Sequence, residues 1–282
     1  MSRVAVVTCT GADDPDNELL FTALSDLDVS TDLVIWDDDA VRWDDYELVV
    51  LRSTWDYPSR RREFLAWARS ITCLQNPIEI VQYSSDKHYL ADLESHGLRI
   101  IPSRFYAVGE TPDFDFGDLV DFVVKPCVGA GSLHVEKYRA RDLAAAERHV
   151  EELHAAGRDV LIQPYIHSVD TLGERALIFI DGTYSHAMRK GAMLDATPDE
   201  RDFLYRRERM SGAVGETDAI AYATEVLSTM GMDDLLYARV DLVATIKGWL
   251  IMELELVEPS LYLRYDDAAA AKLASGIAKR LG

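Results

Sequence analysis

The amino-acid sequence predicts an α/β fold whose first part is a small open α/β layer. The main observation is a β-α-β-β order of hydrophobic patterns, with a strand at 4–9, a helix near 18–27 and strands at 33–36 and 48–51. A second observation is that two pairs of alternating strands, at 175–190 and 237–259, occur among helical stretches later in the chain. The length of 282 residues allows one large domain or about two.

The composition places the chain among globular proteins of a reducing compartment. Hydrophobic residues make up 48% of it, yet no uninterrupted apolar run approaches the ~20 residues that cross a bilayer. The apolar run at 4–7 is too short for a secretory signal and is expected to be the first strand. Cys9, Cys73 and Cys127 lie far apart, with no paired metal-type spacing. We therefore expect a cytoplasmic protein that does not bind a membrane.

The net charge of −20 argues against nucleic acid as a partner, because phosphate contacts need clustered lysines and arginines. Basic residues gather only at 60–62 and 206–209. Seven of the 29 basic residues are lysines, so the position of each lysine is informative. Lys87 and Lys125 stand in segments where a phosphate-binding site would need them.

The loop after the third predicted strand is rich in polar side chains. Arg52, Ser53, Thr54 and Asp56 follow the carboxyl end of that strand, where α/β proteins bind small ligands. An arginine, two hydroxyls and an acid at this place could hold a zwitterionic small molecule. The alternative is a helix-capping turn, since residues 59–68 have a helical pattern.

The next predicted helix begins at the capping run of residues 84–86, reaches His96 and ends at Gly97. This helix would carry Lys87 and hold its ammonium group at one end of the predicted fold.

A strand that ends in Lys125 is followed by a loop of small residues, which contains Gly129, Gly131 and Ser132, and then by another strand. The lysine precedes the glycines, which excludes both a P-loop and a dinucleotide-binding turn. Backbone N–H groups of such a loop can still bind a triphosphate, with Lys125 reaching its oxygens. The alternative is an ordinary glycine hairpin.

A helical stretch at 141–156 leads to a strand at 159–163, which Pro164 interrupts. A proline leaves neighbouring backbone groups unpaired, and such an edge suits an adenine ring, which needs one donor and one acceptor. We expect five residues to contribute to a nucleoside site: Gln163, Tyr165 and Ile166 at the adenine edge, and Asp170 or Glu174 at the ribose hydroxyls.

The predicted hairpin at 175–190 delivers Arg189 and Lys190 to its far end. Adjacent strand residues point to opposite faces, so at most one of the two is expected to reach a site directly. Residues 191–217 are charged and aperiodic, and a loop of this length is typical of a lid. Four arginines make it a candidate cover over phosphates: Arg201, Arg206, Arg207 and Arg209.

A helix at 217–230 precedes the second hairpin, and an alanine-rich helix ends the chain. Alternation with period two places Arg239 and Asp241 on one face of the first strand, and Glu253 and Glu255 on one face of the second. Three converging carboxylates raise each other's pKa values unless a positive charge lies between them. Oxygen ligands without histidine or cysteine suit magnesium. The alternative is a solvated strand face with ordinary charges.

In this order, the motifs resemble the ATP-grasp superfamily over residues 83 to about 263: Lys87, the strand at 123–126, the loop at 129–132, the edge at 163–166, Arg239-x-Asp241 and Glu253-x-Glu255. The resemblance implies an ATP-grasp fold, with two α+β lobes that grip ATP and an N-terminal Rossmann-like substrate domain. It also implies two magnesium ions. The expected domains are 1–82 and 83–282, the latter with a central lobe at 83–163 and a C-terminal lobe at 164–282.

The same resemblance implies a role for each site residue. Lys87 and Lys125 would hold the α- and β-phosphates, and the loop at 129–132 would cover the γ-phosphate. Arg239 would clamp the transferring phosphoryl group and then the oxyanion, with Arg189 and Lys190 completing the catalytic set. The expected magnesium ligands are Asp241, Glu253 and Glu255. Glu255 stands where the superfamily often has asparagine, which should tighten metal binding.

Five segments are more narrowly similar to the cyclo-ligase family of cycloserine biosynthesis: 7–9, 51–57, 86–90, 189–191 and 253–261. That similarity implies that ATP phosphorylates the carboxylate of a small amino acid, O-ureidoserine, and that the ring closes by internal attack. Two alternatives stay open: an intermolecular carboxylate–amine ligase of the glutathione synthetase type, and an ATP-binding regulatory module without turnover. Substrate chirality and a homo-oligomeric state are left open as well.

Overall fold

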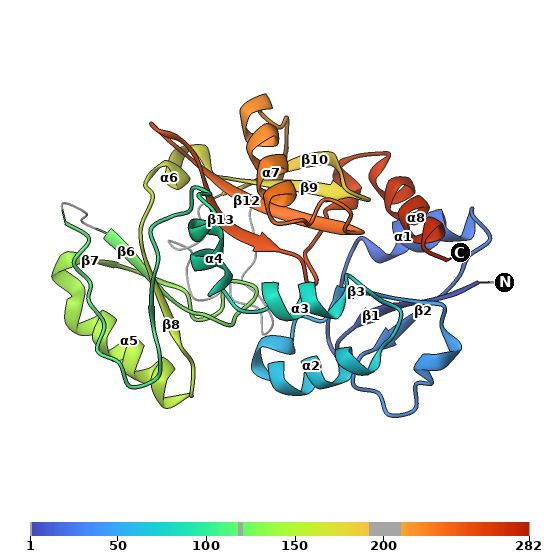
Figure 1. Cartoon of the computed structure of the whole chain (residues 1–282), viewed down its shortest axis with the longest axis horizontal. Coiled ribbons are helices and arrows are strands. Elements are labelled where there is room, and N and C mark those ends of the chain that lie inside the picture. The colour runs from blue at the N-terminus through green and yellow to red at the C-terminus, as the bar shows by residue number, and fades with distance from the viewer. Residues whose placement is uncertain (1, 118–120, 192–209, 282) are drawn as a thin grey trace.

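Three β-sheets form the framework of the protein in this computed structural model, which describes residues 2–117, 121–191 and 210–281 (Figure 1). The predicted α/β class is confirmed. No helix within these ranges is long and apolar enough to cross a membrane. The predicted lid arginines, Arg201, Arg206, Arg207 and Arg209, lie outside the described residues.

The N-terminal sheet has the strand order β2-β1-β3-β4, with every pair parallel. β3 is buried along its whole length, as expected for an unbroken apolar strand that is covered on both faces. The elements are β1 (Arg3–Thr8), α1 (Asn17–Ser25), β2 (Ser30–Ile35), β3 (Leu48–Ser53), α2 (Arg61–Ser70) and β4 (Leu74–Gln75), with 3₁₀ turns at Trp43–Asp45 and Tyr57–Ser59. The predicted β-α-β-β order is therefore confirmed.

Two short helices, α3 (Ile78–Ser84) and α4 (Tyr89–Ser95), replace the single helix that was expected from residue 84 to His96. The Ser84 hydroxyl donates to the Leu254 carbonyl at 2.9 Å and accepts from the Leu256 N–H at 3.1 Å. These contacts fix Ser84 at the end of α3 instead of the start of a helix. Lys87 therefore lies in the turn between the helices. The predicted domain boundary at 82 and 83 falls inside α3 and stays a prediction.

The central sheet has the order β5-β8-β6-β7, and all its strand pairs are antiparallel. Its elements are β5 (Arg104–Tyr106), β6 (Asp121–Pro126), β7 (Glu136–Arg139), a 3₁₀ turn (Ala140–Asp142), α5 (Leu143–Ala155) and β8 (Val160–Pro164). Alternation along β6 buries Phe122 and Val124 against α5. Val123 and Lys125 therefore point to the other face, away from α5.

The C-terminal sheet is antiparallel, with the order β11-β10-β9-β12-β13. Its elements are β9 (Glu174–Ile180), β10 (Thr183–Lys190), β11 (Met210–Ala213), β12 (Tyr237–Thr245) and β13 (Gly248–Glu255). The accompanying helices are α6 (Ser168–Leu172), α7 (Thr217–Thr229), a 3₁₀ turn (Leu263–Tyr265) and α8 (Ala269–Lys279). Both predicted hairpins are therefore present.

The two faces of the C-terminal sheet are covered by different parts of the chain. Ala238, Val240 and Leu242 of β12 join a core that contains residues of α4 and α7. Tyr237 points the other way and packs in a core shared with α1 and α8, which lie together beside the N-terminal sheet (Figure 1). Arg239 lies on the same face as Tyr237. The site residues of β12 thus face the N-terminal sheet.

The link between the N-terminal sheet and the rest of the chain is held by Asn76, which is fully buried. Its Nδ2 donates to the carbonyls of Tyr237 and Leu256, both at 2.9 Å. One side chain therefore joins the end of the first sheet to β12 and to the segment after β13.

We expect Asn76→Ala to lower the free energy of unfolding by about 2–4 kcal/mol, because two buried carbonyls lose their donor. Urea unfolding measures this change. Asn17→Ala is the matched control: its buried Oδ1 has no hydrogen-bond partner, so a loss below ~1 kcal/mol is expected. Equal losses in the two variants would contradict the linking role of Asn76.

Candidate active site

A cavity of about 550 Å³ lies where the three sheets meet, and residues of all three regions line it. The N-terminal part contributes loops that follow β1 and β3, including Asp14 and Trp55. The central sheet contributes Lys125 of β6, and the C-terminal sheet contributes Arg239 of β12 and Glu253 of β13. The cavity therefore depends on residues that are far apart in the sequence.

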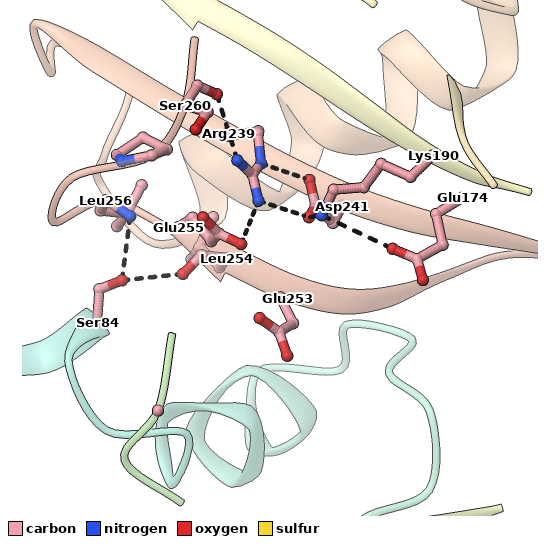
Figure 2. A network of polar contacts seen from close by, with 12 residues as sticks. Ser84, Glu174, Lys190, Arg239, Asp241, Glu253, Leu254, Glu255, Leu256 and Ser260 are labelled. Carbon is pink, nitrogen blue, oxygen red and sulfur yellow. Dashed lines mark hydrogen bonds and ion pairs between the residues drawn. The ribbon is translucent and has the colours of Figure 1, made fainter. Parts of the chain in front are cut away.

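The predicted charged face of the β12–β13 hairpin is present and in register. Asp241 lies opposite Glu253, and Arg239 lies opposite Glu255. The Arg239 guanidinium donates to both oxygens of Asp241, at 2.9 and 3.1 Å, and also to Glu255 (Figure 2). It also donates to the Ser260 carbonyl at 3.2 Å. Arg239 is 3% exposed, so these contacts hold its charge in the interior.

Lysines from three other segments complete the charge pattern around this hairpin. Lys190 of β10 contacts Asp241 at 2.6 Å and lies 3.8 Å from Glu174 (Figure 2). Lys125, at the end of β6, donates to Glu253 at 2.9 Å. Lys87 lies 3.9 Å from the same carboxylate and donates to the Gly129 carbonyl at 3.0 Å. We call Lys87, Lys125, Lys190 and Arg239 the basic cluster.

The basic cluster sets the pKa values of two of the carboxylates. Burial raises the pKa of Asp241, but Arg239 and Lys190 outweigh burial and leave it below its ordinary value. In the same way, Lys125 and Lys87 outweigh burial at Glu253 and hold its pKa well below the usual range. Both side chains are therefore ionised at neutral pH.

Two further acids are not balanced in this way. Burial raises the pKa of Glu255 to about 7; Arg239 lowers it, while Asp241 raises it further. Burial, together with the nearby Glu255, raises the pKa of Glu258 to about 8. Burial therefore favours the protonated, uncharged form of Glu258 at neutral pH and leaves Glu255 close to its midpoint.

The β12–β13 hairpin presents the carboxylate side chains that the predicted magnesium site needs. Carboxylate oxygens suit this ion, and a cation beside Glu255 would lower the pKa that burial raises there. Among the residues that the structure describes, however, no three carboxylate, histidine or cysteine side chains are grouped as a metal cage. Asp241 is 1% exposed and paired with Arg239 and Lys190. The three-ligand magnesium site therefore stays a prediction, and Glu253 and Glu255, with side chains 25% and 30% exposed, are its most accessible candidate ligands.

The predicted nucleoside residues lie together, with two differences. Gln163, Tyr165, Ile166 and Glu174 line the cavity, whereas Asp170 does not. The Asp170 carboxylate instead accepts the Tyr165 hydroxyl. The Tyr165 N–H is also occupied, because it donates to the Asp121 carbonyl at 2.9 Å. Among the residues of this edge, Ile166 is therefore the better candidate for an adenine contact.

The glycine loop lies beside the basic cluster, and Gly129, Gly131 and Ser132 line the cavity. Gly131 and Ser132 have φ angles of 60° and 55°, so two successive residues adopt the left-handed conformation. This conformation favours glycine and turns the chain sharply. The loop therefore forms part of the cavity wall and also joins β6 to β7.

The four residues predicted as a substrate site after β3 lie outside the cavity lining. Arg52, Ser53 and Thr54 are fully buried, and neither these residues nor Asp56 line the cavity. Arg52 donates to the Pro259 carbonyl at 3.0 Å and pairs with Asp14 at 3.4 Å. Ser53 bonds to Thr8, and Asp56 accepts from the Trp36 indole. Trp55 and Tyr57 of this loop line the cavity instead.

The prediction that only one of Arg189 and Lys190 reaches the site agrees with the geometry. Lys190 points into the cavity, and Arg189 does not line it. The Arg189 guanidinium donates to the carbonyls of Leu172 and Thr171 at 2.8 and 2.7 Å. We therefore no longer assign Arg189 to the catalytic set.

Several lining residues were not identified from the sequence. They are the acids Asp13, Asp14, Asp16 and Glu258, the apolar residues Ile101, Val123 and Met252, and Ser260, Tyr262 and Arg264. A signal existed for Glu258, which belongs to the similar segment at 253–261. For the acids of the loop after the first strand, the sequence showed only residues that are typical of a turn and no sign of a binding site.

Comparison with known proteins identifies the family. A family model described as "D-cycloserine synthetase DcsG, N-terminal domain" matches residues 4–79. The "Cycloserine biosynthesis protein DcsG" of Streptomyces lavendulae is 36% identical, over 95% of this chain and 94% of that protein. The chain belongs to the DcsG family. Membership makes it an enzyme, an ATP-dependent ligase.

Solved structures of the DcsG family and of more distant ligases support the same fold. A crystal structure of D-cycloserine synthetase DcsG is similar with a TM-score of 0.90 and 35% identity over 100% of both chains. The D-alanine–D-alanine ligase of Bacillus anthracis, complexed with ATP, has a TM-score of 0.70 at 15% identity, over 100% of this chain and 97% of that chain. The predicted ATP-grasp fold is therefore confirmed.

We expect the stability of the protein to fall as pH rises from about 5 to 8.5, in part because of Glu258. A carboxyl whose pKa is raised in the folded state binds more protons there than in the unfolded chain, so its contribution is lost as pH rises toward about 8. Glu258→Gln removes the titrating carboxyl. The free energy of unfolding should therefore fall less between pH 5 and 8.5 in this variant than in the wild type, by a few kcal/mol.

Urea unfolding of both proteins at pH 5.5 and 8.5 measures the effect. Glu94→Gln, at an exposed position on α4, is the control. An identical pH dependence in wild type and Glu258→Gln would show that Glu258 does not take up a proton in the folded state.

Proposed function

We propose that this enzyme uses ATP to activate the carboxylate of O-ureidoserine and closes the molecule into the cycloserine ring. ADP and phosphate are released, and water removes the carbamoyl group as carbon dioxide and ammonia. The observation that carries the proposal is the basic cluster: four cationic side chains from four separate segments line one cavity of about 550 Å³. That volume is typical of small-molecule sites, which run from about 300 to 1,000 Å³. The relative from Streptomyces lavendulae, named for cycloserine biosynthesis, supports the choice of substrate.

ATP and magnesium fit the two sides of this cavity. Lys87, Lys125 and the loop with Gly129, Gly131 and Ser132 would hold the phosphates, and Glu253 and Glu255 would hold Mg²⁺. Val123, Ile166 and Met252 give the neighbouring wall an apolar surface that suits adenine, and Glu174 is the acid available to the ribose. When bound, ATP and Mg²⁺ supply a phosphoryl group that converts a carboxylate oxygen into a leaving group.

Arg239 is the residue best placed to stabilise the charge that develops during ring closure. Its guanidinium is buried and held by Asp241 and by the Ser260 carbonyl, so it need not reorganise when the carboxyl carbon is attacked. A fixed donor in such a dry site contributes about 3–4 kcal/mol to comparable reactions. Asp241, kept ionised by two cations, orients both Arg239 and Lys190.

The direct test is to incubate the enzyme with ATP, Mg²⁺ and O-ureidoserine and to measure phosphate release and product mass. A product with the mass of cycloserine, formed without a second substrate, is expected. Phosphate release only after an amine is added would favour an intermolecular ligase instead. Binding of ATP without phosphate release, in the presence of every amino acid of a panel, would favour a regulatory module.

Adjacent residues of β10 offer a matched pair of variants. Lys190→Met should lower kcat/KM by about 100-fold or more, because it removes a buried cation next to Asp241. Arg189→Met should change it less than about fourfold, since Arg189 contacts only backbone carbonyls outside the cavity in the described structure. Steady-state kinetics measures kcat/KM for both variants. Equal losses of kcat/KM would contradict the assignment of Lys190, and not Arg189, to the active site.

A further inference from the structure

The cavity has an acidic wall as well as the basic cluster. We define the acidic wall as Asp14 and Asp16, in the loop after β1, and Glu258, in the segment after β13; all three line the cavity and are at most 7% exposed. Buried carboxylates need a positive partner or several hydrogen bonds. The three carboxylates of the wall differ in whether they already have such partners.

Asp14 is the satisfied member of the wall. It pairs with Arg52 at 3.4 Å, and its other oxygen accepts the Asp16 N–H at 3.0 Å. Burial raises the pKa of Asp14, and Arg52 and Arg264, which also lines the cavity, offset part of that rise. Asp14 therefore holds the loop in place, and its carboxylate is already paired with Arg52.

Asp16 and Glu258 differ from Asp14. One Asp16 oxygen accepts the Leu263 N–H at 3.0 Å, but the other, Oδ1, is buried without a hydrogen-bond partner. Neither Asp16 nor Glu258 forms an ion pair within 4.0 Å with a cation of the described residues. These two acids are thus positioned in the cavity wall with unused capacity to accept hydrogen bonds from a cation.

Hydrogen bonds and an ion pair connect the two segments of the acidic wall, which are distant in the sequence. Arg52, fully buried, bridges Asp14 and the Pro259 carbonyl, which is next to Glu258. The Asp16–Leu263 contact ties the same loop to the same segment. Between these two ties, the Ser260 carbonyl accepts from Arg239. The acidic wall therefore adjoins the basic cluster along residues 258–263.

This arrangement matches a zwitterion whose two charges are one carbon atom apart. An α-amino acid has its ammonium and carboxylate groups on the same carbon, so one can meet the acidic wall while the other meets Arg239. The described residues of the wall do not form a metal cage. An ammonium, with three N–H donors, suits Asp16 and Glu258 better than a compact ion does, and its charge lowers the raised pKa of Glu258, so that this carboxyl is ionised when the substrate is bound.

Resting on the proposed function, we infer that Asp16 and Glu258 bind the α-ammonium group of the amino-acid substrate. Three consequences follow from this contact. It turns the substrate carboxylate toward Arg239, and it keeps the α-nitrogen protonated. A protonated nitrogen has no lone pair, so the ring-closing nitrogen elsewhere in the substrate is left as the nucleophile.

The test compares the binding of O-ureidoserine with that of an analogue in which the α-ammonium group is replaced by hydrogen. Calorimetric titration measures both dissociation constants without turnover. The wild-type protein should bind the analogue about 10- to 100-fold more weakly. Glu258→Gln and Asp16→Asn should each shrink that ratio by about tenfold, while the affinity for ATP stays within about twofold.

Glu18→Gln is the matched control, because it removes the same charge from an exposed position in the first turn of α1, just after that loop and outside the cavity lining. It should keep the wild-type ratio. The thermal unfolding midpoint of each variant shows whether it is folded. If Asp16→Asn does not fold, the binding ratio of Glu258→Gln alone decides the test.

Equal binding of substrate and analogue by wild type, or an unchanged ratio in the folded variants, would overturn the inference. The proposed function fails by a different readout, the absence of phosphate release from wild type with O-ureidoserine. The two failures are therefore distinguishable.

Discussion

Charge balance on one buried sheet face is the constraint on which this enzyme depends. Arg239, Asp241, Glu253 and Glu255 are side by side on β12 and β13, and none of them is stable there alone, because an unpaired buried charge costs several kcal/mol. Their partners arrive from outside the hairpin, on β10, on β6 and in the turn after α3. The site is therefore complete only when the three sheets are packed together. The same pairing keeps the lysines ordered inside the cavity, where mobile side chains would bind phosphate less well.

Periodicity predicted the parts of the fold and site that depend on local pattern. The alternation in 237–243 and 249–259 placed Arg239 opposite Glu255 without knowledge of any tertiary contact, and the β-α-β-β order of the N-terminal sheet followed from apolar runs. The split between α3 and α4 could not be predicted, because Ser84 is a good helix cap whose hydroxyl is instead used by Leu254 and Leu256, about 170 residues away along the chain.

The same limit explains the substrate side of the cavity. Arg52 follows a strand, as ligand-binding residues often do, but only the fold reveals that Pro259 and Asp14 surround it. The true lining residues of that region, Trp55 and Tyr57, were in the predicted loop but lacked a distinguishing pattern. Glu258 and Asp16 are single acids in a chain with 49 acidic residues, so composition could not mark them.

The Arg52 bridge has a consequence for how such enzymes diversify. A guanidinium with no solvent access that binds one residue of the first loop and one near the end of the chain makes these regions interdependent. An N-terminal unit transplanted from another ligase would carry its own loop but not the matching segment around Pro259, and the buried hydrogen bond between the two regions would be lost. New substrate ranges are therefore more accessible by exchanging both regions together than by recombining whole modules.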